Sequence, residues 1–341
     1  MLKMTRRKFT VLAVTAAFAA ATPFAHADQS KVIKISHQFP ASTDANGDFR
    51  DRLVKRFAEE VEKRTKGSLK FEIYPGGSLM KASSQIGGLR KGALDMALVP
   101  LAYGGGEIPI ANITLMPTLV TGYQQGLNWK NQPIGQELDK QLQAKNIKLI
   151  TWVWQAGGIV STKSPVVVPD DAKGLKFRGG SKEMDQMLKG AGAAVTNMPS
   201  SEIYSAMQSG VLDAALTSST SLISFRLQEF AKYATSAQNK SFWFMFEPLM
   251  INKQLFDSLS PEQQKAVVEV GASLDKFAME EAQKDDQRMA QVYSKAGVKV
   301  STMDDKAFYQ WRKIAEETAF KDFAERMPNG RALLDMALSV K

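Results

Sequence analysis

The chain has 341 residues, of which 44% are hydrophobic and 23% charged, so it is long enough for two domains and has the composition of a folded, water-soluble protein. With no cysteine and only two histidines, the sequence excludes disulfides, a thiolate nucleophile and a histidine-rich metal site. The net charge is +9, but the lysines are scattered along the chain. Their scatter favours a solvated surface over a nucleic-acid-binding patch.

Residues 1–27 have the features of an export signal. The basic segment Lys3–Lys8 precedes the mainly apolar stretch Val11–Ala21, which is too short to span a bilayer. Ala25-His26-Ala27 matches the small-x-small pattern of a signal-peptidase site. The pair Arg6-Arg7 fits a twin-arginine signal and an ordinary Sec leader equally well, so the export route stays open. We expect the mature protein to act in a bacterial periplasm.

The first part of the mature chain alternates between strands and helices. Hydrophobic periodicity predicts strands at Val32–Ser36, Leu69–Tyr74 and Ala93–Val99, with helices at about 46–66 and 81–91. This alternation is typical of an α/β protein with a largely parallel sheet.

Two later segments rich in β-formers are candidate crossing points between two lobes. The first is Ile147–Trp154, a predicted strand that Gln155-Ala156-Gly157-Gly158 is expected to break. The second is Ser236–Phe246. Beyond it, Ser260-Pro261-Glu262-Gln263 predicts a helix start by a capping box, with the helix continuing to about Ala296. At ~1.5 Å per residue this helix is on the order of 50 Å long, enough to brace both lobes.

The stretch Pro169–Ser221 holds the leading candidate for ligand binding. A turn leads into the short predicted strand Leu175–Arg178, which two glycines follow, so an arginine lies at a strand tip. A serine-capped helix at Ser200–Gly210 then leads into a buried strand at Val211–Leu216 and the hydroxyl-rich loop Thr217–Ser221. An arginine at one strand tip and hydroxyls at another would frame an anion.

Residues 89–98 and 207–216 share one pattern. Each segment reads as a helix, a capping glycine, a small residue, Leu-Asp and a short apolar strand. The similarity indicates an α/β unit that occurs twice, although chance convergence of a common pattern is the alternative. If the repeat is real, each lobe turns a strand-end loop toward a shared cleft, where ligands of open α/β sheets bind.

Several of these motifs together resemble the solute-binding proteins of TRAP transporters, of the DctP type. The resemblance covers nearly all of the mature chain and implies an α/β, two-lobe fold like that of periplasmic binding proteins, with a hinge and a long bracing helix. It also implies a protein without cofactor or catalytic activity that captures a small organic acid for the membrane subunits of a TRAP-type secondary transporter. The motifs that carry it are 174–178, 202–213, 37–40, 74–79 and 92–97.

These expectations divide the chain into lobes. We expect residues 28–151 and 240–280 to form lobe I, and residues 152–239 and 281–341 to form lobe II. The tail, Asp304–Leu338, is helical by pattern and is expected to pack on lobe II.

Arg178 is the leading site residue, because the resemblance places the family's carboxylate-binding arginine in this Gly-Leu-Lys-x-Arg motif. A planar guanidinium donates two hydrogen bonds to a carboxylate at once, and Gly179 beside it is expected to leave room for the ligand. No metal ligand is assigned. The other candidates are residues at strand ends and near the expected crossings, namely His37, Gln38, Phe39, Tyr103, Trp154, Thr217, Ser218, Ser219, Phe242 and Trp243.

The chain departs from the family pattern at two places. Members often have an amide or an acid where this chain has Leu216 and Thr217, and many carry a second arginine where this chain has Gly158-Ile159. The missing polar groups and the nearby aromatic residues predict an aromatic or branched-chain acid as the ligand.

Two other functions stay open. An exported enzyme acting on a small carboxylate would need an acid–base pair in the cleft, and the sequence shows no histidine cluster, no G-x-S-x-G elbow and no metal-ligand spacing. A ligand sensor for a membrane receptor would have the same sequence features as a transport protein. The sequence leaves open which acid binds.

Overall fold

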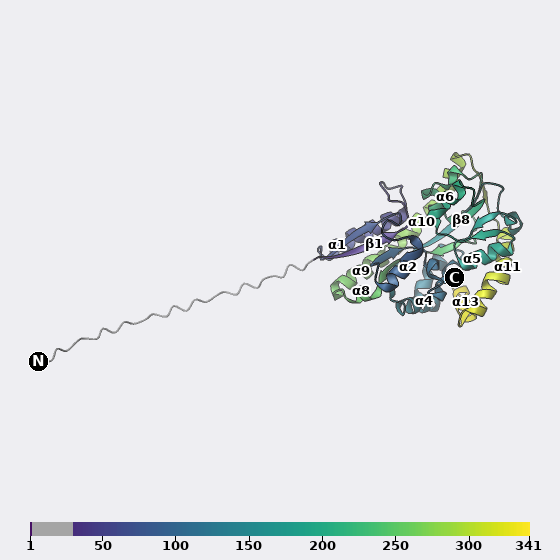
Figure 1. Cartoon of the computed structure of the whole chain (residues 1–341). Coiled ribbons are helices and arrows are strands. Elements are labelled where there is room, and N and C mark those ends of the chain that lie inside the picture. Colours follow the sequence, from purple (N-terminus) through teal and green to yellow (C-terminus); the bar gives the residue numbers. More distant parts are fainter. Residues whose placement is uncertain (2–29) are drawn as a thin grey trace.

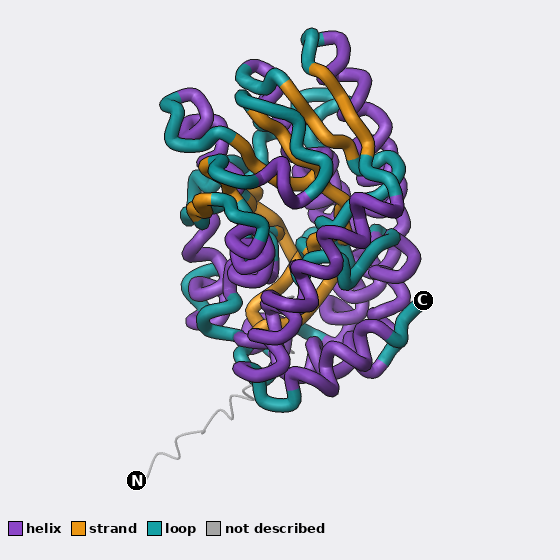
Figure 2. The backbone as a smooth tube through the Cα atoms, turned by 90° about the vertical axis from the view of Figure 1, so that its right-hand side faces the viewer, coloured by secondary structure: helices purple, strands orange, loops and turns teal. Residues whose placement is uncertain are grey.

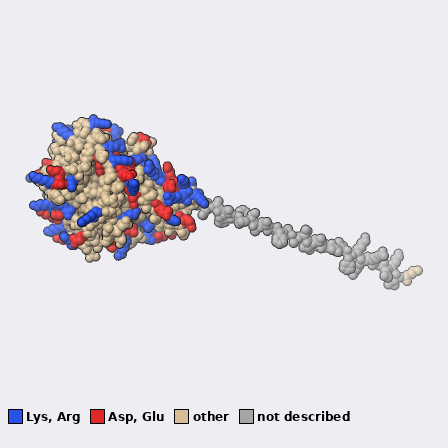
Figure 3. Space-filling view, turned by 180° about the vertical axis from the view of Figure 1, so that it is seen from behind, with Lys and Arg blue, Asp and Glu red and all other residues tan. Residues whose placement is uncertain are grey.

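The computed structural model describes Met1 and residues 30–341, so the predicted export signal lies outside the described residues. Figure 1 shows an elongated body, with α1 (Phe49–Arg64), α8 (Lys253–Asp257) and α9 (Pro261–Ser273) toward one end and α5 (Lys182–Gly190) and α11 (Asp305–Ala315) toward the other. Among the described helices, none is both long and apolar enough to cross a membrane. On the face seen in Figure 3, basic and acidic side chains are interspersed.

The first sheet has five strands in the order β2-β1-β3-β11-β4, and β11 alone runs antiparallel to its neighbours. We call the part of the molecule around this sheet lobe I. Its strands are β1 Lys31–His37, β2 Leu69–Tyr74, β3 Met96–Leu98, β4 Ile147–Thr151 and β11 Leu249–Asn252, and its helices are α1 Phe49–Arg64, α2 Ala82–Lys91, α3 Tyr123–Asn128, α4 Pro133–Gln143 and α8 Lys253–Asp257.

The second sheet has the order β12-β9-β5-β8-β6-β7, with β10 paired to β5, and we call the part around it lobe II. In the view of Figure 2, helices flank the strands of both sheets. The predicted two-lobe α/β fold is therefore confirmed. The elements of lobe II are β5 Trp154–Ser161, β6 Lys176–Arg178, β7 Ala194–Thr196, β8 Ala214–Ser218, β9 Tyr233–Ser236, β10 Phe244–Phe246, β12 Lys299–Thr302, α5 Lys182–Gly190, α6 Ile203–Gln208 and α7 Ser219–Ser224.

The chain crosses between the sheets three times, at the short connections 152–153 and 247–248 and again along the helical segment 253–298 between β11 and β12. The prediction that residues 155–158 break the strand is wrong, because β5 runs straight through them. The glycines serve close packing instead. A Cβ on Gly157 would lie 2.4 Å from both the Thr217 carbonyl oxygen and the Trp243 ring.

The bracing helix begins at the predicted capping box, where Ser260 Oγ accepts from the Gln263 amide. It is two helices rather than one, α9 Pro261–Ser273 and α10 Asp275–Lys295, so the single predicted helix is corrected. The first packs on α1 and β4 of lobe I, and the second packs on β5, α7 and β12 of lobe II and also on α1 of lobe I. The helical hydrogen bonding is interrupted at Leu274, near the point where the helices pass from one lobe to the other.

The repeated unit has the same backbone device in both lobes. Gly92 and Gly210 end the two helices with φ of 70° and 72°, a left-handed conformation that favours glycine. The Asp95 carboxylate accepts from the Lys34 amide at 2.9 Å, and the Asp213 carboxylate accepts from the Lys176 amide at 3.0 Å. Each aspartate thus ties its strand to the adjacent parallel strand.

The C-terminal tail is helical, as predicted, but it packs on both lobes. Its elements are α11 Asp305–Ala315, a π-helical turn at Glu316–Phe320, α12 Lys321–Arg326 and α13 Gly330–Leu338. The first two contact α5 of lobe II, whereas α13 contacts α4 of lobe I. The expectation that the whole tail packs on lobe II is therefore wrong.

Glu183 of α5 gives the fold a pH dependence. It is buried, and its Oε1 accepts from Arg326 of α12 at 2.9 Å. Burial raises the pKa of Glu183 from 4.5 to about 7, and the Arg326 charge lowers it only in part. Because the folded pKa lies above the unfolded one, this group favours folding most below about pH 4.5, and that contribution is lost as the pH rises to about 7.

The variant Glu183→Gln is therefore expected to lose less stability as the pH rises. Its free energy of unfolding should match wild type at about pH 4 and exceed it by at most about 3 kcal/mol at about pH 8. Urea unfolding of the variant and of wild type between about pH 4 and pH 8 measures these free energies. Equal pH slopes for the two proteins would contradict the assignment to Glu183.

Candidate functional site

Arg178 ends β6 and is 2% exposed. Its Nε donates to the Met198 carbonyl at 3.0 Å, and its Nη1 donates to the Leu216 carbonyl at 2.7 Å. Its Nη2 donates to the Tyr103 hydroxyl, in the short helix that follows β3 of lobe I, at 3.1 Å. The guanidinium therefore lies where the two lobes meet.

Two of the five N–H groups of Arg178, one on each terminal nitrogen, have no hydrogen-bond acceptor within residues 30–341. No carboxylate of the described chain lies within ion-pair distance of it either. A buried charge without a partner is costly, so the site favours an anion. A carboxylate can accept from both terminal nitrogens at once.

Tyr103 is placed to add one more donor. Its hydroxyl oxygen accepts from Arg178 and, at 2.9 Å, from the Ser200 amide. Since both acceptor positions are used, the hydroxyl proton is left to donate. The structure thus brings together two predicted site residues from different lobes.

The two glycines after Arg178 pack against protein groups. A Cβ on Gly179 would lie 2.1 Å from Asp185 Oδ1, and one on Gly180 would lie 2.6 Å from Arg178 Nη1. They make room for these side chains rather than, as expected, directly for a ligand. Burial raises the pKa of Asp185, and the nearby Arg178 charge lowers it in part.

His37, Gln38 and Phe39, at the end of β1 and just after it, differ in whether their polar groups already have partners. The His37 Nε2 lies 3.1 Å from Asp51 Oδ1, and its Nδ1 accepts from the Phe39 amide, so neither ring nitrogen is left for a ligand. Phe39 stacks on His37. Gln38 is 2% exposed, and neither its Oε1 nor its Nε2 has a partner in the described chain. Of these residues, Gln38 has polar groups still available to a ligand.

The predicted hydroxyl-rich loop is not a loop. Thr217 and Ser218 end β8, and Ser219 begins α7. Ser218 caps this helix, since its Oγ accepts from the Ser221 amide at 3.1 Å. All four residues are buried, and Ser219 lies beside Asp286 of α10.

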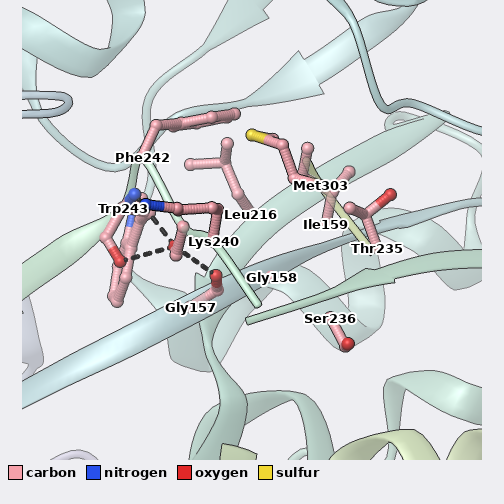
Figure 4. Close-up of a pocket in the computed structure, with 11 residues that line it drawn as sticks. Gly157, Gly158, Ile159, Leu216, Thr235, Ser236, Lys240, Phe242, Trp243 and Met303 are labelled. Atoms are coloured by element: carbon pink, nitrogen blue, oxygen red, sulfur yellow. Dashed lines mark hydrogen bonds between the residues drawn. The ribbon is translucent and has the colours of Figure 1, made fainter. Parts of the chain in front are cut away.

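The tryptophan and phenylalanine candidates are buried in the core, and most of them pack against other aromatic side chains. Trp154 packs against Phe246, while Phe242 packs against Trp311 of the tail. Figure 4 shows Phe242 and Trp243 at a cavity of about 10 Å³, which has room for about one water molecule and not for an organic acid. The indole N–H groups of Trp154 and Trp243 have no partner in the described part of the chain.

Sequence reasoning missed a buried polar cluster where the lobes meet. Arg50 of α1 donates to Glu247 Oε2 at 3.2 Å, and Gln155 also bonds this oxygen. Burial raises the pKa of Glu247 to about 7, and the Arg50 charge lowers it in part. One signal was present, because Arg50 falls on the same helical stripe as the buried Leu53 and Phe57.

Comparison with known proteins gives the family. The sequence matches the DctP family, described as "Bacterial extracellular solute-binding protein, family 7", over residues 15–326. This chain belongs to that family. A solute-binding protein of Albidiferax ferrireducens is 56% identical over 309 residues, which is 91% of each chain. The predicted resemblance to TRAP solute-binding proteins is confirmed, and so is the prediction of an extracytoplasmic solute-binding protein.

Solved structures of related proteins agree with the fold. A TRAP periplasmic solute-binding protein from Rhodoferax ferrireducens with bound malonate is 56% identical, has a TM-score of 0.89 and covers 90% of this chain and 98% of its own. DctP7 of Bordetella pertussis, a receptor that binds pyroglutamic acid, is 22% identical with a TM-score of 0.81, covers 90% and 99%, and supports the fold alone. The 2,3-diketo-L-gulonate-binding protein YiaO of Escherichia coli is 29% identical over 75% of this chain and 78% of its own.

Proposed function

We propose that this DctP-family protein captures a small carboxylate in the periplasm and delivers it to the membrane subunits of a TRAP transporter. The observation that carries the proposal is the buried Arg178, which has two free N–H groups and no ion-pair partner in the described chain. The malonate in the 56% identical structure supports a carboxylate as the ligand class.

Capture is proposed to involve closure of the lobes. The lobe boundaries that go with this proposal are the connections at residues 152–153 and 247–248 and the break between α9 and α10 at Leu274. In the closed form the ion pair between Arg178 and the ligand is shielded from water, which strengthens it. Hinge closure of this kind occurs in periplasmic binding proteins.

The ligand is proposed to leave unchanged, so the protein acts as a receptor and not as an enzyme. Gln38 and the Tyr103 hydroxyl are proposed to contact the ligand as well, since both have free hydrogen-bonding groups. The malonate of the related structure is smaller and more polar than the aromatic or branched acid predicted from the sequence, and a ligand panel separates the two.

Calorimetry with purified mature protein tests the proposal. The panel contains malonate, succinate, pyroglutamate, glucuronate, a branched-chain acid and an aromatic acid, with malonamide as the uncharged control. At least one acid should bind with micromolar or tighter affinity, and malonamide should not bind. Mass spectrometry of the acid released from the protein should show that it is unchanged. Failure of every acid to bind, or recovery of a chemically altered ligand, would contradict the proposal.

A further inference from the structure

Arg50, in the first turn of α1, is fully buried, and its guanidinium lies 3.5 Å from the centre of the Phe39 ring. Within lobe I, its Nε and Nη2 donate to Asp48 at 2.9 and 2.6 Å. Its Nη1 donates to Glu247, in the second connection between the sheets, at 3.2 Å. Two carboxylates and an aromatic ring therefore hold this guanidinium in place.

The same guanidinium also reaches lobe II. Its Nη1 lies 3.0 Å from Ser221 Oγ and 3.4 Å from Ser218 Oγ, so its two N–H groups are shared among these hydroxyls and Glu247. Its Nη2 donates to Ser224 Oγ at 3.5 Å. These serines belong to the end of β8 and to α7. One arginine of lobe I thus bonds three hydroxyls on a single segment of lobe II.

The two sets of contacts differ in what their loss costs. Separation from Asp48 or Glu247 would leave a buried charge unpaired, which is strongly unfavourable. Separation from the serines breaks only hydrogen bonds to hydroxyls, and water can replace those. The carboxylates therefore fix the position of Arg50, and the serine contacts are free to form and break.

Water has a route to these contacts. A cavity of about 230 Å³ lies between residues 40–48 of lobe I and residues 220–224 of lobe II, and Asp48 and Ser224 are among its lining residues. The lobes therefore do not pack densely beside the Arg50–serine contacts. Solvent can enter there when the lobes separate.

We propose that Arg50 is a positioning residue for ligand capture, which holds the Ser218–Ser224 segment against lobe I only while the lobes are closed. The inference rests on the proposed function, because it assumes that closure accompanies binding. Ser218 is itself a predicted ligand residue, between Thr217 and Ser219, so the contact with Arg50 fixes that part of the site in the closed form. Since the contact exists only in that form, its loss speeds ligand release and leaves association unchanged.

The variant Ser221→Ala tests the inference, because Ser221 is not a predicted ligand residue and the Asp48–Arg50–Glu247 cluster stays intact. With malonate, or whichever acid of the panel binds, the dissociation constant should rise about tenfold through a faster dissociation rate. Ser209→Ala is the matched control, since Ser209 is an exposed serine of lobe II that bonds only to its own helix. It should bind like wild type.

Arg50→Lys gives a second, independent measurement. The lysine keeps the positive charge beside Asp48 and Glu247 but lacks the fork that reaches the serines. Arg50→Lys should weaken binding at least as much as Ser221→Ala does. Adding Ser221→Ala to it should cause little further loss, because both changes remove the same contact, between Arg50 and Ser221. Additive losses would overturn the proposal.

A distance measurement shows the closure itself. The chain has no cysteine, so dyes on Ser84→Cys and Gln208→Cys, in exposed positions of α2 and α6, label each lobe once. The closed fraction with ligand should fall in Ser221→Ala and stay at the wild-type value in Ser209→Ala. A lower melting temperature with unchanged closed fraction and dissociation rate would overturn the inference while the proposed function stands. If the wild-type protein bound none of the acids, both the proposed function and the inference about Arg50 would be contradicted.

Discussion

Replacing Arg178 by methionine is expected to weaken binding of the acid by roughly a hundredfold or more. Removing one partner of a buried, hydrogen-bonded charge pair costs about 2 to 5 kcal/mol, and about 3 kcal/mol corresponds to a factor of more than a hundred. Methionine fills similar space without donors, so the carboxylate of the ligand would be buried without its cation. Calorimetry of the variant with the acid that binds wild type measures the loss.

Two further variants separate charge from geometry. Arg178→Lys keeps the charge but not the planar fork, and it should lose about tenfold or more in affinity. Arg331→Met is the control, because Arg331 is an exposed arginine on α13 whose carboxylate partner Asp335 is also exposed. If Arg178→Met bound the acid within about threefold of wild type, with circular dichroism showing a folded protein, Arg178 would not be the carboxylate ligand.

Replacing Gly157 by alanine is expected to cause the largest loss of stability among the variants considered. A Cβ at this position would lie 2.4 Å from the Thr217 carbonyl oxygen, which belongs to the paired strand β8 and cannot move aside as a side chain end could. Overpacking of this kind costs about 1 to 3 kcal/mol or more, and the backbone contact places it at the upper end. Thermal and urea unfolding measure the change.

Gly106→Ala is the matched control. No atom lies within 4 Å of a Cβ built on Gly106, and its φ is not in the left-handed range, so the free energy of unfolding should stay the same or rise slightly. Equal stability of the Gly157 and Gly106 variants would mean that β5 and β8 can move apart at this point without cost.

The fold could be predicted largely because local patterns agree with it. The strand Leu69–Tyr74 and the capping box at Ser260 have clear local signals, and both occur where they were predicted. The misassignment at Gly157 has a physical cause. In one sequence, a glycine that ends a strand looks the same as a glycine that lets two strands and an indole ring pack closely.

The candidate site was predictable only where it is local in sequence. Arg178 was found because its motif spans a few adjacent residues. The partners of Arg50 in lobe II and in the second connection lie 168 to 197 residues away, so no spacing rule brings them together. The hydroxyls near Thr217 lie at the start of the short helix α7, where the Ser221 amide donates to Ser218, and a run of serines and threonines in the sequence does not distinguish such a capped helix from a loop.

The matching Asp95 and Asp213 bonds bear on how this molecule arose. In both lobes a left-handed glycine is followed by Leu-Asp, and the carboxylate holds the backbone amide of a lysine in the next parallel strand. Duplication of one ancestral gene segment would leave such a shared detail in the two copies. Chimaeras that exchange the two helix–glycine–strand units would then be a direct way to ask how far the copies have diverged.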